Sequence, residues 1–289
     1  MRPASTGKAA VPLWKRRQRV RVLVRRAITV AIALVALFPI LWGLSTSFKT
    51  TTELATFPPT LLPAHPTLEH YALLFRTGIE RYMLNSVFLS IATVIGCLAF
   101  GSLAAYAMAR VKFRGGNTLL LIIVALMSIP LPSLLVPTFT FLAQLGLLDS
   151  LTGLALLYIA YQLPIAVWVL YGYFLTIPIE LEHAARVDGY SRFATLRKVI
   201  LPLSGPGLVA AGLFVVTFAW NDFVVAVAMT SSDAVRTLPV AIYGYLGFYG
   251  REWGPLTASA ILSTIPVIVI FIVFQRFFLG GMTSGGVKS

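Results

Sequence analysis

Side chains able to do chemistry are few in this chain, and those of its central part gather in one segment. The 289 residues include 10 Asp and Glu, 3 His and 1 Cys. Cys97 lies in an apolar run, and His65 and His70 lie in a proline-rich stretch without a cluster of partners, so we assign no metal. No Gly-x-x-x-x-Gly-Lys-Ser/Thr motif occurs, so the chain is expected not to hydrolyse ATP by itself. The segment from Glu180 to Pro202 holds most of the central charge and is the first candidate for a mechanism.

This segment has the sequence signals of two short helices separated by a turn. Pro178 sits where a helix can start, and Glu180 and Glu182 place carboxylates in its first turn, where they complement the helix dipole. Gly189 can end that helix in a left-handed conformation, and residues 191–200 then favour a second helix. Such an element lies along a membrane surface. Its two small alanines leave room for another protein's groove, but an amphipathic helix that only anchors the loop fits equally well.

The rest of the chain is composed like a membrane protein. Its residues are 58% hydrophobic and 11% charged, whereas soluble domains carry about 25% charged residues. Long apolar stretches, each able to cross ~30 Å of hydrocarbon as a helix, occur at about 27–48, 82–109, 118–145, 150–177, 203–229 and 253–275. We therefore predict an all-α integral membrane protein with six transmembrane helices. Its membrane domain, 27–279, lies between a basic tail, 1–26, and a C-terminal tail, 280–289.

Lysine and arginine are distributed unevenly about these six spans. The side that contains both termini carries 18 of them and the other side carries 5. Because positive residues collect on the cytoplasmic side, both termini and the loop 180–202 are predicted to be cytoplasmic. Topology accounts for the net charge of +13 more simply than nucleic-acid binding does.

The loop also carries a recognisable pattern. Glu182-His183-Ala184-Ala185, then Asp188-Gly189 and Leu201-Pro202, resembles the EAA loop of ATP-binding-cassette (ABC) importer permeases. That pattern is Glu-Ala-Ala, three residues, Gly, nine residues, an aliphatic, one residue and Leu-Pro, and the spacing here matches throughout. His183 stands in the family's glutamate position, which is associated with an ionic contact to the ATPase. Glu182 is adjacent, but about 100° around a helix.

Further motifs extend the resemblance over most of the chain. They are Asn85-Ser86, the stretch 104–110, Ile129-Pro130, the stretch 219–223 and the tail 280–288, which is similar to that of the maltose-type G permeases of the carbohydrate-uptake 1 family. The resemblance implies the type I importer fold in the plasma membrane. It also implies a second homologous permease, two ATPase subunits that hold ATP and Mg, an extracytoplasmic solute-binding protein, and no cofactor or enzymatic activity in this chain.

The resemblance assigns roles to particular residues. The ATPase-coupling set is Glu182, His183, Ala184, Ala185, Asp188, Gly189, Leu201 and Pro202. The loop 230–252 resembles the scoop of the maltose system, so Tyr243, Gly244, Tyr245 and Gly247 are expected to contact the binding protein. The tail 283–288 is expected to touch the ATPase.

Candidate residues for the pathway or gate are Pro130, Pro137, Trp220, Asn221 and Asp222. The prolines free backbone carbonyls, which a cavity can satisfy, although helix bending explains them as well. Trp220 can stack on a sugar or lie at the membrane interface. Asp222 lies 19 residues beyond Leu203, which is ~28 Å along a helix and near the outer interface. Asp222 can therefore contact the solute or act as a structural cap.

An ion-driven secondary transporter is the alternative function. Such carriers usually need acids at the membrane midplane or broken half-helices, and Asp222 is the only acidic residue inside a predicted span. A membrane enzyme would need a cluster of His, Asp, Glu or Ser inside the spans, and none is present in the sequence. The solute is expected to be chosen by the external binding protein.

Overall fold

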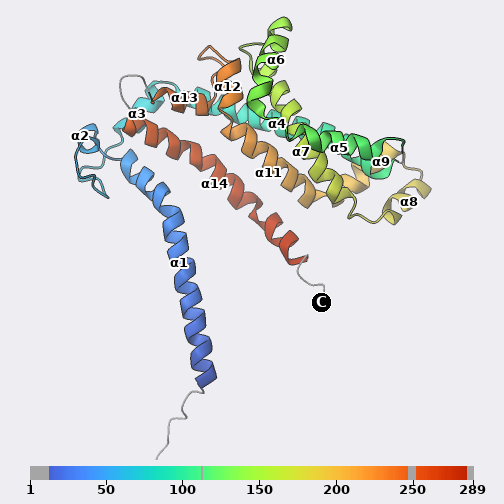
Figure 1. Cartoon of the computed structure of the whole chain (residues 1–289), viewed down its shortest axis with the longest axis horizontal. Coiled ribbons are helices and arrows are strands. Elements are labelled where there is room, and N and C mark those ends of the chain that lie inside the picture. The colour runs from blue at the N-terminus through green and yellow to red at the C-terminus, as the bar shows by residue number, and fades with distance from the viewer. Residues whose placement is uncertain (1–12, 112, 247–251, 285–289) are drawn as a thin grey trace, which may run out of the picture.

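The computed structural model describes residues 13–111, 113–246 and 252–284, which are helical and contain no strand. The N-terminal helix α1 (Leu13–Ser47) projects away from the body and packs mainly against α14 (Trp253–Ser284) along part of its length (Figure 1). Its apolar side chains are exposed from Val22 to Leu41. Within the described chain, nothing covers most of this helix.

The body is built on three helices that pack along one another: α4 (Ile79–Arg110), α7 (Leu151–Phe174) and α11 (Gly205–Asn221). Leu89, Tyr158 and Val225 are fully buried in one core cluster, and Leu170 and Phe174 in a second. The packing leaves no room for a side chain at Gly207, where a Cβ would lie 2.4 Å from the Tyr173 ring. A glycine at this position therefore sets how closely α11 approaches α7.

The third predicted span is sharply broken. It consists of α5 (Gly116–Leu126) and α6 (Leu131–Gln144), which meet at 98°, and Pro130 precedes α6. A second bend, of 83°, separates Arg192–Leu203 from α11. Four described helices are long and apolar enough to cross a membrane, and up to six spans result if each bent pair counts as one. A proline lacks the N–H of a regular helix, which explains the position of the first break.

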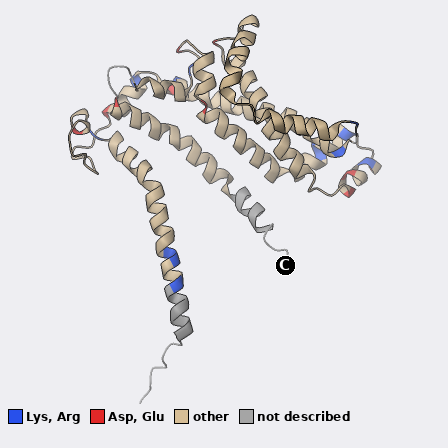
Figure 2. Ribbon diagram, viewed as in Figure 1, with Lys and Arg blue, Asp and Glu red and all other residues tan. Residues whose placement is uncertain are grey.

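Short helices occupy the two ends of the body. At one end lie α2 (Thr51–Leu54), α3 (Glu69–Arg76), α12 (Val224–Met229) and α13 (Leu238–Gly244), and at the opposite end lie α8 (Glu180–Val187) and α9 (Arg192–Thr195) (Figure 1). A π-helical turn, Leu196–Ile200, and α10 (Leu201–Leu203) connect α9 to α11. Charged residues gather at these two ends and on α1, while the middle of the body is uncharged (Figure 2).

Candidate coupling loop and membrane face

The candidate coupling segment, residues 180–202, folds as α8, a glycine turn and a second helical stretch, as the sequence predicted. The second stretch is not one regular helix, because a π-helical turn, Leu196–Ile200, separates α9 from α10. Helix α8 ends at Val187, Asp188 is its C-cap, and Gly189 follows with φ +85°. The Tyr190 N–H donates to the Ala185 carbonyl (3.0 Å), and the Gly189 N–H donates to the Arg186 carbonyl (3.1 Å). These two bonds form a Schellman motif, which satisfies the last carbonyls of α8. The Ser191 hydroxyl then caps α9 by accepting from the Ala194 N–H at 3.2 Å.

Glu182 points inward and ties α8 to the body. Its carboxylate forms an ion pair with the Arg110 guanidinium at the end of α4, and it accepts a 3.0 Å hydrogen bond from the Tyr106 hydroxyl. Arg110 also donates to the carbonyls of Phe174 (2.9 Å) and Ile177 (2.7 Å) at the end of α7. The side chains of Arg110 and Glu182 are only 10% and 7% exposed. One buried pair therefore fixes α8 against two membrane helices.

The neighbouring positions of α8 point outward. His183 and Ala184 are exposed, whereas Ala185 is buried. Asp188 and Gly189 are exposed at the turn. Because consecutive residues of a helix are rotated by about 100°, Glu182 faces the body and His183 faces the surface. Glu182 is thus held inside and does not supply an acidic group to the outward face.

Leu201 and Pro202 lie at the elbow between the surface helices and α11. Leu201 packs against the core cluster that contains Leu170 and Phe174, and Pro202 is exposed. The chain turns by 83° immediately after α10. This Leu-Pro pair therefore joins the coupling loop to the fifth apolar stretch.

Asp222 and Trp220 have structural partners. The Asp222 carboxylate accepts from the Tyr158 hydroxyl (2.7 Å) and from the backbone N–H groups of Ala226 (2.9 Å) and Val225 (3.3 Å), so it caps α12. Trp220 is buried, and its indole N–H donates to the Ser263 carbonyl on α14 at 3.1 Å. These contacts favour the structural cap for Asp222, and they place Trp220 inside the body, packed against α14.

The other candidate pathway residues are exposed, and a cavity lies beside the break in the third span. Asn221 is exposed and donates only to the Thr217 carbonyl of its own helix, while Pro130 and Pro137 are exposed on the broken span. A cavity of about 340 Å³ opens next to Pro130. Its lining includes Tyr161 and Gln162 on α7, Phe214 and Phe218 on α11, and Met127, Ile129, Leu131 and Leu134 around the break. An amide and three aromatic rings in one cavity suit a ligand with hydroxyl groups and apolar faces.

The loop 230–237 is held from two sides. The Asn85 amide donates to the carbonyls of Ala234 (3.0 Å) and Arg236 (2.9 Å). The Asp149 carboxylate accepts from the N–H groups of Ser231 (2.8 Å) and Ser232 (3.0 Å). These backbone donors hold the pKa of Asp149 below its ordinary value of 3.8. These hydrogen bonds fix the loop segment that leads to α13.

The residues expected to contact a binding protein lie at or near this same end. Tyr243 is exposed on α13, and its ring packs against that of Phe223 with centroids 4.8 Å apart. Gly244 ends α13, and the half-buried Tyr245 follows it. Gly247 lies outside the described residues. No group of three or more His, Cys, Asp and Glu that could hold a metal occurs in the described part of the chain.

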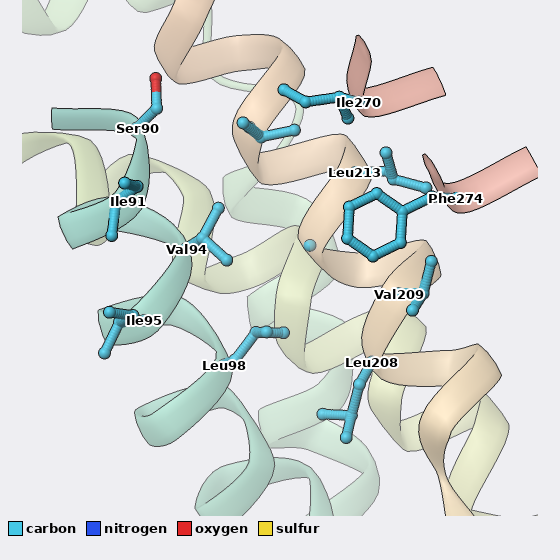
Figure 3. A pocket seen from close by; sticks show the side chains of 12 residues that line it. Ser90, Ile91, Val94, Ile95, Leu98, Leu208, Val209, Leu213, Ile270 and Phe274 are labelled. Atoms are coloured by element: carbon cyan, nitrogen blue, oxygen red, sulfur yellow. The ribbon is translucent and has the colours of Figure 1, made fainter. Parts of the chain in front are cut away.

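An apolar groove of about 320 Å³ runs between α4, α11 and α14 (Figure 3). Val94 and Leu98 of α4 line one wall, Leu213 lies across from them on α11, and Phe274 approaches from α14. Ser90 supplies the polar atom of the lining, and its buried hydroxyl has no hydrogen-bond partner. Such an apolar lining suits lipid or another membrane helix rather than a polar ligand.

Sequence reasoning did not identify Arg110, Tyr106 or Asn85 as functional partners. Arg110 entered the charge count and the motif 104–110, which also contains Tyr106, and Asn85 entered only as part of a motif. Arg110 and Glu182 are 72 residues apart in the chain. The available signal was the position of Arg110 at the end of an otherwise uncharged stretch.

The sequence model of the family described as binding-protein-dependent transport system inner membrane component matches residues 97–283. The chain belongs to this family. It is similar to a sulfoquinovosyl glycerol transport permease of Agrobacterium fabrum, with 37% identity over 91% of this chain and 93% of that one. It is also similar to the trehalose transport permease SugB of Mycobacterium tuberculosis, with 38% identity over 88% and 93% of the two chains.

Solved structures show the same fold. A chain from a bacterial ABC transporter that imports alginate superposes with a TM-score of 0.78 at 24% identity, covering 93% of this chain and all of that one. The protein is thus a multi-pass membrane subunit with the fold of type I ABC importer permeases. Such permease subunits are not themselves enzymes, because ATP is hydrolysed by a separate subunit.

Proposed function

We propose that this chain forms one half of the membrane pathway of an importer for a sugar or sugar-like solute. Relatives named for transport of sulfoquinovosyl glycerol, trehalose, and trehalose or maltose are 33–38% identical to it over about nine-tenths of its length. The chain has no phosphate-binding loop, so two partner ATPase subunits supply ATP and Mg.

The observation that carries the coupling role is the two-sided construction of α8. Its inward face is fixed to α4 and α7 through Glu182 and Arg110, and its outward face, with His183 and Ala184, is exposed. A helix that is rigidly attached on one side and open on the other can transmit the movement of a docked partner. The excess of Lys and Arg on the same side as the termini supports a cytoplasmic position for this loop, where ATP is available.

A second homologous permease completes the pathway. The exposed apolar length of α1 and the groove between α4, α11 and α14 both face outward from the body. An apolar surface of this extent suits lipid or another membrane helix. The cavity next to Pro130 supplies this chain's part of the solute path, because Gln162 and Tyr161 give polar groups inside an otherwise apolar stretch.

An extracytoplasmic binding protein delivers the solute to the opposite end of the body. Tyr243 and Gly244 are exposed there, next to the loop that Asn85 and Asp149 hold in place. A rigid support beneath exposed aromatic residues is what a docking surface needs.

The test uses the complete transporter in proteoliposomes. Gly189→Val should lower solute uptake per ATP hydrolysed, because a β-branched side chain resists a φ of +85° and adds bulk to the docking face. Gly189→Asn is the matched control for backbone strain, since asparagine tolerates that conformation. Unchanged coupling in the valine variant would remove the loop from the mechanism. Uptake that follows an ion gradient without ATP would favour a secondary transporter instead.

A further inference from the structure

A small basic cavity lies between the coupling loop and the end of α4, with the exposed residues His183, Arg186 and Arg192 at its edge. Its volume is about 90 Å³, and the polar and charged side chains of its lining are Tyr106, Arg110, Glu182, His183, Arg186 and Arg192. Glu182 is the acidic group among them, and it is already paired with Arg110. Arg186 and Arg192 are exposed, and no ion pair joins either of them to an acid within the described residues. The cavity therefore presents uncompensated positive charge.

The local fold explains why these groups converge. His183 and Arg186 are three residues apart on α8, so they lie on the same face of the helix. The turn at Gly189 reverses the chain and brings Arg192, the first residue of α9, to the same cavity. Glu182 and Ala185 are also three residues apart, but they face the body and are buried. Glu182 is thus turned inward, whereas His183 and Arg186 are exposed at the cavity.

The size of the cavity limits what can enter it. Its volume of about 90 Å³ corresponds to about three waters at about 30 Å³ each. A sugar or a nucleotide is too large, whereas the tip of an Asp or Glu side chain fits. Two guanidinium groups are well suited to such a tip, because arginine binds a carboxylate through two parallel N–H···O bonds.

Exposed apolar residues around the cavity indicate a protein as the source of the carboxylate. Val187 is 88% exposed and Phe193 is 64% exposed, and both lie on the same loop. A free anion would leave them in water, whereas a docked protein would cover them. We propose that this cavity receives an Asp or Glu side chain of the ATPase subunit that docks on the coupling loop. The inference rests on the proposed coupling function and adds the chemistry of the contact.

The first test reverses the charges of the cavity. The permease pair, stripped of its ATPase subunits, is placed in nanodiscs of neutral lipid, and rebinding of the ATPase subunits is measured. Arg186→Glu and Arg192→Glu should each weaken rebinding about tenfold or more, because each places like charges together at a contact. Arg197→Glu is the matched control, since Arg197 is exposed on the neighbouring π-helical turn and does not line the cavity. Arg192→Gln removes the positive charge without reversing it, and it should weaken rebinding less than Arg192→Glu does.

The second test identifies the occupant. Arg192→Lys keeps the positive charge and provides an amine that a carbodiimide joins to a carboxylate in direct contact. Peptide mapping should show a new link, absent in the wild type, between the substituted lysine and an Asp or Glu of the ATPase subunit. Arg197→Lys should give no such link.

Several outcomes overturn the inference. A link to a carboxylate of the permease itself would show that the charge is satisfied internally. An equal loss of ATPase rebinding in the cavity variants and in Arg197→Glu would show a general effect of charge. Losses that appear only in vesicles with anionic lipid would assign the arginines to lipid headgroups. If the ATPase subunits fail to bind even the wild-type permease, the proposed function fails, not this contact alone.

Discussion

The pair between Arg110 and Glu182 makes the strongest prediction about coupling. Arg110→Ala would leave the Glu182 carboxylate buried without its cation, and it would also remove the donors to the carbonyls of Phe174 and Ile177. The hydrogen bond from Tyr106 would remain at 3.0 Å. The substitution therefore breaks three interactions while one is kept.

The expected cost is large for a single substitution. Removing one partner of a buried ion pair costs about 3–5 kcal/mol, because the other charge is left uncompensated. Each 1.4 kcal/mol is a factor of about ten. The equilibrium between docked and released α8 should therefore shift toward release by a factor of about a hundred or more. Tyr106→Phe should cost only about 1–3 kcal/mol, since it removes one hydrogen bond to a charged group.

Hydrogen exchange at α8 and the ratio of solute imported to ATP hydrolysed measure this effect together. Arg110→Ala should increase exchange across α8 and lower the ratio, while ATP hydrolysis continues. The double variant Arg110→Met with Glu182→Leu should recover much of the stability, because no charge remains buried. If Arg110→Ala leaves both the exchange of α8 and the transport ratio unchanged, the pair does not position the coupling helix.

Three further predictions concern the membrane helices and loop 230–237, which lies at the end of the body opposite the coupling loop. Gln162→Leu should reduce solute uptake several-fold without changing thermal stability, because Gln162 lines the cavity at the break; uptake at saturating binding protein is the measurement. Trp220→Phe should lower stability by about 1–3 kcal/mol in thermal unfolding but leave solute preference unchanged, because its N–H bonds Ser263. Backbone N–H donors of loop 230–237 lower the pKa of Asp149 below 3.8 in the folded protein. The stabilisation of the loop by the Asp149 carboxylate is therefore present above pH 3.8, and it is lost as the pH falls through the lowered pKa of the folded protein. Pepsin cleavage within loop 230–237 should therefore increase as the pH falls. Asp149→Asn should remove this dependence on pH.

The sequence predicted the long helices well because their signal is local. A stretch without charge and about 20 residues long must be helical if it crosses a membrane. The break at residues 127–130 was visible only as prolines, which suit a mild kink as well as the observed 98° bend. The angle depends on packing of α6 and α5 against distant helices, and such contacts leave no periodic signal in the sequence.

The coupling loop shows the same limit at the level of single residues. Helix signals and the Gly189 turn were readable, because capping depends on neighbours within a few residues. The helix period also showed that Glu182 and His183 face different ways. The sequence did not show which groups each side chain contacts, because Arg110, the partner of Glu182, lies 72 residues away in the chain. A buried ion pair between distant segments needs the fold before it can be identified.

Helix α4 connects the two ends of the molecule. Arg110 at its last turn holds the coupling helix, and Asn85 near its start holds loop 230–237. The two residues are 25 positions apart in the chain, which is about 38 Å at 1.5 Å per residue. Unlike α1, α7 and α14, this helix has no proline inside it, so it can transmit displacement without a built-in kink.

Asn85→Ala should therefore weaken the stimulation of ATP hydrolysis by a solute-loaded binding protein, although the substituted side chain lies at the opposite end of α4 from the coupling loop. Losing both carbonyl contacts would free the loop from the helix end. Asn117→Ala, which removes an exposed amide on α5, is the matched control and should leave the stimulation intact. Stimulation is measured as the ratio of ATPase rates with and without loaded binding protein in proteoliposomes. A normal ratio in the Asn85 variant, with the loop shown by proteolysis to be released, would mean that α4 does not link the two ends.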